Sequence, residues 1–153
     1  MKTRITMVMF VALLLSVFSA KAQIAVNGVK THTKMTKSEV IAKFGKPDKY
    51  LYQDSGDNGV NEWYHYGETH FVFKDECFID FAVCDKNLSV TLGGLDSDIT
   101  VGDNISVLSP LDLKKMDRPW QEKDLYCVYY NDAKVIFKIE DHIIKWISYF
   151  FPD

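Results

Sequence analysis

Apolar residues are spaced first as in a helix and then as in strands, and this order occurs twice along the chain. Val40, Ile41 and Phe44 recur at helical spacing, which predicts a short helix with one apolar face. Residues 62–82 then alternate apolar and polar side chains, as half-buried strands do. The same order returns from Thr100 onward. The pattern therefore predicts an internal repeat.

The first predicted helix carries clear signals at both ends. Thr36 and Glu39 have the spacing of a capping box, in which a hydroxyl and a carboxylate each accept a hydrogen bond from a free backbone N–H. Gly45 and Pro47 favour an end to the helix.

The second copy carries weaker signals. Thr100 and Asp103 open the predicted element. Ile105 and Leu108 form its apolar face, and Pro110 follows. We therefore expect the second helix to be shorter or more frayed than the first.

Two-residue turns separate the predicted strands in both copies. Gly67-Glu68 and Asn131-Asp132 each stand between runs of strand-forming residues, which is typical of β-hairpins. We predict an α+β fold in which two tandem helix-plus-antiparallel-hairpin repeats form one continuous sheet with helices on one face. Residues 23–90 would form repeat 1 and residues 91–153 repeat 2, together one compact domain.

The stretch from Thr36 to Pro47 has the pattern T-x-x-E-V-x-x-x-F-G-x-P, and aromatic hairpins follow it. This arrangement resembles the β-lactamase-inhibitor-protein-like superfamily. It is similar to the unit of the SmpA/OmlA-type outer-membrane assembly lipoproteins, here as two tandem copies over nearly all of residues 23–153. The resemblance implies a continuous antiparallel sheet with helices on one face and a protein-binding surface on the other.

Residues 1–22 have the order of regions found in a signal peptide. Lys2 and Arg4 precede an apolar stretch, and Ala20-Lys21-Ala22 provides a small-x-small cleavage site. No cysteine stands at that site, in contrast to lipoproteins. We expect a periplasmic or secreted protein that begins at Gln23 and has no membrane span in its mature form.

The chain beyond residue 22 is acidic. Three of the 18 Lys and Arg residues lie in residues 1–22, which leaves 15 against 21 Asp and Glu and a formal charge of −6. A nucleic-acid-binding protein needs a basic surface. The charge therefore argues against nucleic acid as a partner.

Three cysteines fall in this part of the chain, Cys77, Cys84 and Cys127. Cys77 and Cys84 stand near opposite ends of one predicted strand, about 23 Å apart at about 3.3 Å per residue. A disulfide allows only about 7 Å between Cα atoms, so this pair is excluded unless the strand breaks. A Cys84–Cys127 disulfide and three free thiols are both open.

Strand alternation divides the predicted sheet into two faces. Pairing across the Gly67-Glu68 turn places Tyr64 under the helices and Trp63 on the helix-free face. The same alternation predicts that Trp146 faces the helices and that Ile147 faces away from them.

The helix-free face is predicted to carry more aromatic and aliphatic residues than a solvated sheet face needs, and such patches mark interaction sites. The alternatives are that the N-terminal segment or a second copy of the chain covers it. Trp120, in a polar loop, is a second candidate, and the alternatives for it are insertion into a partner pocket and packing back onto the sheet edge. The predicted partner-binding residues are Trp63, His65, His70, Phe78, Trp120, Tyr129 and Ile143.

The sequence holds no G-x-S-x-G, H-E-x-x-H or C-x-x-C motif and no phosphate-binding glycine loop. His65 and His70 are predicted to lie opposite each other, with Asp80 on a nearby strand, and these are donor types for an open zinc site. This trio is a weak metal candidate, and no cofactor is predicted.

Together these features favour a non-catalytic protein-binding module, inhibitor-like or envelope-associated, that binds its partner through the helix-free face. The alternatives are a small-ligand or metal-binding protein that uses the cross-strand His pair, and a structural homodimer.

Overall fold

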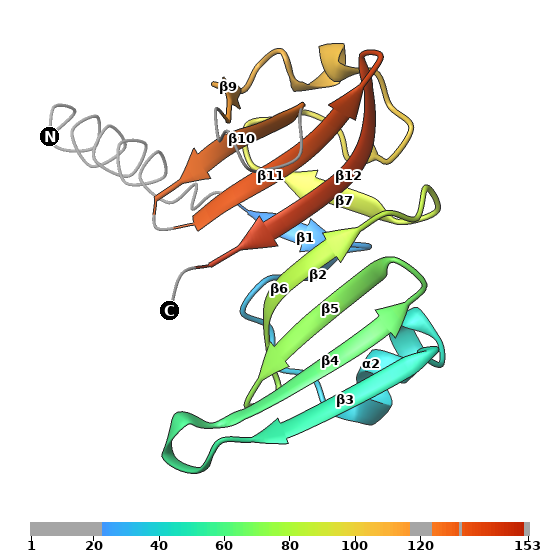
Figure 1. Cartoon of the computed structure of the whole chain (residues 1–153), viewed down its shortest axis with the longest axis vertical. Coiled ribbons are helices and arrows are strands. Elements are labelled where there is room, and N and C mark those ends of the chain that lie inside the picture. Colours follow the sequence, from blue (N-terminus) through green and yellow to red (C-terminus); the bar gives the residue numbers. More distant parts are fainter. Residues whose placement is uncertain (1–22, 117–123, 132, 152–153) are drawn as a thin grey trace, which may run out of the picture.

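The computed structural model describes residues 23–116, 124–131 and 133–151. These fold into two antiparallel sheets (Figure 1). The eight-stranded sheet has the order β3-β4-β5-β6-β12-β11-β10-β9, and the four-stranded sheet has the order β2-β1-β7-β8. The predicted signal peptide, residues 1–22, lies outside the described residues.

The eight-stranded sheet consists of β3 (Lys49–Asp54), β4 (Val60–Tyr66), β5 (Thr69–Lys74), β6 (Cys77–Val83), β9 (Lys114–Lys115), β10 (Leu125–Tyr130), β11 (Ala133–Glu140) and β12 (Ile143–Phe150). The four-stranded sheet consists of β1 (Ile24–Val26), β2 (Val29–Lys30), β7 (Ser89–Leu92) and β8 (Ile99–Thr100). The described helices are α2 (Lys37–Phe44) and the 3₁₀ helices η1 (Gly56–Asn58) and η2 (Ile105–Leu108).

The prediction of an α+β fold with two helices over one continuous sheet is wrong. The described chain is mostly β, with one α-helix and two sheets. The layer that packs against the eight-stranded sheet consists largely of β1, β2, β7 and β8. This sheet forms because residues 24–26 of β1 pair with residues 90–92 of β7, far away in the sequence, while β2 pairs with β1 and β8 with β7.

The first predicted helix is confirmed as α2. Glu39 Oε2 accepts a hydrogen bond from the Thr36 backbone N–H at 2.7 Å, and Thr36 Oγ1 accepts from the Glu39 N–H at 3.4 Å, which completes the capping box. Gly45 ends the helix with a positive φ of 88°. Val40 is buried, and the Phe44 ring lies 4.4 Å from the ring of Phe71. Local signals and tertiary packing therefore agree at this helix.

The second predicted helix is wrong, because the segment is held by hydrogen bonds to a distant turn. Thr100 ends β8, and Asn104 caps the single 3₁₀ turn of η2. The Ile105 N–H donates to the His142 carbonyl at 2.7 Å, and the Ile144 N–H donates to the Asp103 carbonyl at 2.9 Å. These tertiary bonds replace the helical ones. No helix in the described ranges is long and apolar enough to cross a membrane.

Both predicted hairpins are confirmed in register. Tyr66 pairs with Thr69 and His65 with His70 across the first turn, and Tyr130 pairs with Ala133 across the second. The β6–β12 pairing then joins the two halves of the chain within the eight-stranded sheet.

Two β-bulges reverse the predicted faces of several residues. Ile79 is an extra residue opposite β5, so Phe78 pairs with Phe73 and is fully buried. Lys145 is an extra residue opposite β11, so Trp146 pairs with Lys138. The predicted faces of Phe78, Trp146 and Ile147 are therefore wrong, since a bulge shifts the alternation by one residue.

The hydrophobic core lies between the two sheets and under α2. Aromatic residues of the eight-stranded sheet meet aliphatic residues of the smaller sheet. The largest fully buried side chains include Tyr64, Phe71, Phe73, Phe78, Phe81, Phe137, Leu92, Ile99 and Leu108.

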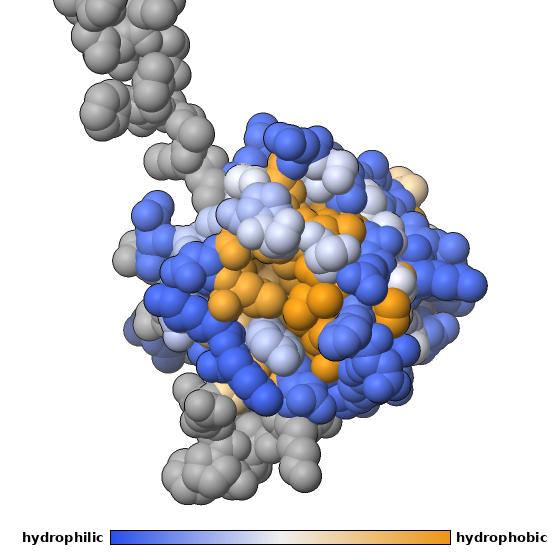
Figure 2. Space-filling model, turned by 90° about the horizontal axis from the view of Figure 1, so that it is seen from above, coloured by the Kyte–Doolittle hydropathy of each residue, from blue (hydrophilic) through white to orange (hydrophobic). Residues whose placement is uncertain are grey.

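One end of this sandwich is closed by η2 and the segment that follows it. Figure 2 looks onto this end and shows apolar side chains gathered inside a rim of hydrophilic ones. Ile105, Leu111 and Leu113 pack against the core there, and Val107 is 37% exposed.

A buried carboxylate connects β3 and β4 beneath α2. Glu62 accepts hydrogen bonds from the hydroxyls of Tyr50, at 2.5 Å, and Tyr64, at 3.1 Å. Lys37 Nζ lies 3.4 Å from the centroid of the Tyr50 ring. Burial and the hydrogen bond to Glu62 raise the pKa of Tyr50 to about 12. This network supplies the polar partners that buried groups require.

Replacement of Glu62 by Ala is expected to lower the free energy of unfolding by about 3 kcal/mol, because two hydroxyls lose a charged acceptor and Tyr64 stays buried. Urea denaturation measures this loss. Glu62→Gln keeps an acceptor and should lose about half as much, while Glu68→Ala at an exposed turn should lose little. Equal midpoints for wild type and Glu62→Ala would contradict the assignment.

Candidate functional site

The outer face is the face of the eight-stranded sheet that points away from the four-stranded sheet. Figure 1 looks onto it, with α2, β1 and β7 behind the sheet. No described helix or strand lies over this face. The sheet therefore presents its outward side chains directly at the surface.

A hollow of about 570 Å³ lies on the outer face at the β3 end of the sheet. Its lining residues are Leu51, Tyr52, Gln53, Trp63 and His65. Trp63 pairs with Leu51 on one side and Val72 on the other, so the indole is half-buried among apolar neighbours. The predicted face of Trp63 and His65 is confirmed.

The histidine pair beside this hollow is also confirmed, but a metal centre is not supported. The His65 and His70 ring centroids are 5.6 Å apart. Burial, and then the charge of His65, lower the pKa of His70. Within the described residues, no three His, Cys, Asp or Glu side chains are arranged to hold a metal ion. The trio with Asp80 therefore lacks the geometry of a metal site.

Lysines surround the aromatic residues of the outer face. Lys134 Nζ lies 5.6 Å from the centroid of the Phe150 ring, and Lys114 Nζ lies 6.0 Å from that of Tyr129. Both are cation–π distances. The lysines that strand register places on this face are Lys49, Lys74, Lys114, Lys134 and Lys138.

The other predicted partner-binding residues are scattered. Tyr129 is 61% exposed on β10, but five strand spacings of about 4.8 Å place it about 24 Å from Trp63. Phe78 is in the core. Ile143 is half-buried and bridged to Asn104. Trp120 lies outside the described residues.

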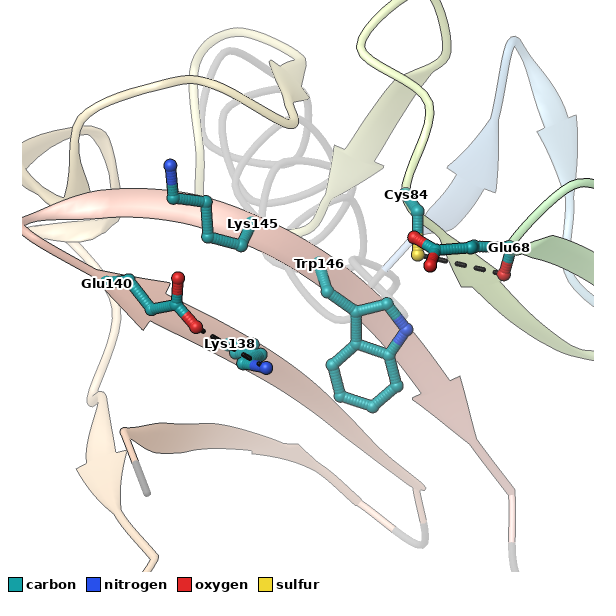
Figure 3. A pocket seen from close by; sticks show the side chains of 6 residues that line it. All are labelled: Glu68, Cys84, Lys138, Glu140, Lys145 and Trp146. Atoms are coloured by element: carbon teal, nitrogen blue, oxygen red, sulfur yellow. Dashed lines mark hydrogen bonds and ion pairs between the residues drawn. The ribbon is translucent and has the colours of Figure 1, made fainter. Parts of the chain in front are cut away.

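A second pocket, of about 490 Å³, opens where β6 separates from β12. Figure 3 shows the Trp146 indole between the Lys138–Glu140 pair and the Glu68–Cys84 pair. Lys138 Nζ is 3.4 Å from a Glu140 carboxylate oxygen. The sequence pattern missed this pocket, because the bulge at Lys145 turns Trp146 outward.

The pocket does not hold an activated nucleophile. Burial and the neighbouring Glu68 raise the pKa of the Cys84 thiol, against a smaller lowering by Lys138. Cys84 Sγ donates to the Glu68 carbonyl at 3.7 Å. Since the thiolate is the reactive form, this arrangement does not favour covalent catalysis.

All three cysteines are free. The order of strands separates β6 from β10 by β12 and β11, so Cys84 and Cys127 lie at least about 14 Å apart at about 4.8 Å per spacing. That distance excludes a disulfide within one chain, which leaves three free thiols.

Asp80 is the most perturbed acid on the outer face. Burial raises the pKa of its carboxyl to about 7. Its strand neighbour on β5 is Val72, which does not stabilise the charge. A group held in this way is costly to ionise, and such groups cluster at functional sites.

Comparisons with known proteins do not assign the chain to a family. A scan against protein-family models, a search of curated proteins and a search of solved structures each found no match. The resemblance to the β-lactamase-inhibitor-protein-like superfamily therefore stays a prediction.

Asp80→Asn is expected to stabilise the protein at pH 8 by about 1 kcal/mol, because it removes a buried charge that is partly hydrated. With the pKa raised to about 7 in the fold, wild-type stability is full below about pH 4 and falls as pH rises to about 7. Melting temperatures at pH 4 and pH 8 test this.

The matched control is Asp57→Asn at an exposed 3₁₀ turn, which should show no such pH-dependent gain. A gain for Asp80→Asn that is the same at both pH values would contradict the assignment to carboxyl desolvation.

Proposed function

We propose that this protein is a non-catalytic protein-binding module that binds its partner through the outer face of the eight-stranded sheet. The observation that carries this proposal is the half-buried Trp63 in its hollow, on a sheet face that no described element covers. Trp and Tyr are the residues that most often anchor interfaces. Apolar patches with a polar rim mark interaction surfaces on soluble proteins.

The lysines of the outer face favour a partner with an acidic surface. The chain beyond residue 22 carries a formal charge of −6, yet five lysines lie on this face. Lys134 pairs with Tyr129 and Phe150, and Lys49 pairs with His65. This uneven distribution steers a negatively charged partner toward one face. The raised pKa of the Cys84 thiol supports a role without catalysis.

Trp63→Asp is expected to weaken partner binding at least tenfold, because it places a charge at the centre of the hollow. The full chain, tagged at its C-terminus and expressed in its native source, is used to capture partners, and affinities are then measured with the purified partner. Trp63→Phe should retain most of the binding. Tyr129→Asp tests the other end of the face separately.

The matched control is Val107→Asp, which adds the same charge at an exposed apolar site on η2. Circular dichroism establishes that each variant is folded. If folded Trp63→Asp binds every partner as well as Val107→Asp does, the outer face is not the binding surface.

We also propose that the protein acts in the periplasm or outside the cell. The positive residues, apolar stretch and Ala20-Lys21-Ala22 site of residues 1–22 support this proposal. N-terminal sequencing of the protein from the envelope and extracellular fractions should then give a chain that starts at Gln23. A chain retained in the cytoplasm with Met1 intact would contradict it.

A further inference from the structure

The described sheets have four edges, and three of them are very short. β2, β8 and β9 each have two residues. β9 consists of Lys114 and Lys115, and charged, short edge strands prevent unwanted pairing with other chains. The fourth edge, β3, is six residues long.

The free side of β3 is open. β3 pairs only with β4, through all six of its residues, and Figure 1 shows it at the margin of the sheet. Leu51 is 41% and Tyr52 59% exposed, and the four central residues carry no charge. An edge of this length with an uncharged centre leaves a row of backbone N–H and C=O groups available for another strand.

The hollow on the outer face lies directly beside this edge. Leu51, Trp63 and His65 line it, and β3 points Lys49, Leu51 and Gln53 toward that face. A strand added to β3 would place alternate side chains over the same face. Its residue opposite Leu51 would enter the hollow.

We propose that β3 accepts an extended peptide segment of the partner as a ninth strand. The segment carries an apolar residue opposite Leu51 and, two positions away, an acidic residue opposite Lys49. Main-chain hydrogen bonds supply affinity, and the two side chains supply specificity. This inference rests on the proposed function and names the form in which the partner binds.

A second copy of the chain fits less well in the register that sets Leu51 of one copy opposite Leu51 of the other. An antiparallel pair centred on Leu51 of both copies places Asp54 of one copy opposite Asp48 of the other. Like charges directly opposite each other destabilise a strand pair. A peptide with an acidic residue opposite Lys49 has the complementary charge instead.

The test starts from a phage-displayed library of random heptapeptides, selected on the purified chain. Enriched peptides should alternate apolar and polar residues and contain an acid two positions from an apolar residue. Each is then synthesised with N-methyl groups on one or the other alternating set of amides. Only one set faces β3 in an added strand, so one version should lose at least tenfold in affinity and the other little.

Two protein variants complete the experiment. Tyr52→Lys combined with Gln53→Lys gives β3 the lysine pair that protects β9, and it should lose the peptide. Val107→Lys is the matched control and should bind it normally. Amide hydrogen exchange of β3 should slow when the peptide is bound.

The inference is overturned if no peptide is enriched, or if both N-methylated versions bind equally well. It is also overturned if the chain alone doubles in mass and the lysine pair in β3 abolishes that dimer. If Trp63→Asp abolishes peptide binding but N-methylation leaves the affinity unchanged, strand addition is overturned and binding at the outer face still stands. If N-methylation weakens binding but Trp63→Asp does not, the peptide adds to β3 without using the hollow, which contradicts the proposed outer-face surface and leaves strand addition standing.

Discussion

The eight-stranded sheet depends on a short junction between the two halves of the chain. β6 and β12 pair through only three residues each, Phe81–Val83 with Ile147–Tyr149. On the inner side, the Phe81 and Tyr149 rings stack at a centroid distance of 5.6 Å. The pairing ends where Thr69 Oγ1 accepts hydrogen bonds from the N–H groups of Cys84 and Asp85. This junction makes one outer face from two hairpin units, and its end opens the Trp146 pocket.

Features that depend on near neighbours in the sequence were predicted correctly. The capping box of Thr36 and Glu39 and the pairing of Tyr66 with Thr69 involve residues only three positions apart. The second helix failed because Ile105 and Ile144 bond to partners far along the chain. The four-stranded sheet was missed for the same reason, since β1 pairs with β7. A period of apolar residues does not identify the strand with which a segment pairs.

The site was predicted only in part, because the predicted faces assume that side chains alternate strictly along each strand. Trp63 and His65 lie in a hairpin whose register is unbroken up to the turn. The position of the turn was therefore enough to predict which face of the sheet they occupy. Phe78 and Trp146 each stand next to an extra residue, Ile79 and Lys145, that reverses the alternation. Because Trp146 and Ile147 are both apolar, the sequence does not indicate which of them faces the core. The bulge at Lys145 places both Ile144 and Ile147 in the core.

Comparison of the four described sheet edges supports the outer face beside β3 as a binding surface. A protein that must only stay soluble gains by closing every edge, and β2, β8 and β9 are closed by their length. β3 instead keeps six residues with an uncharged centre, beside a hollow that contains Trp63. Such an edge carries a risk of aggregation unless it has a partner. The coincidence of this edge, the longest among the described residues, with the tryptophan hollow is what a binding site for an extended strand requires, and neither feature alone would have indicated it.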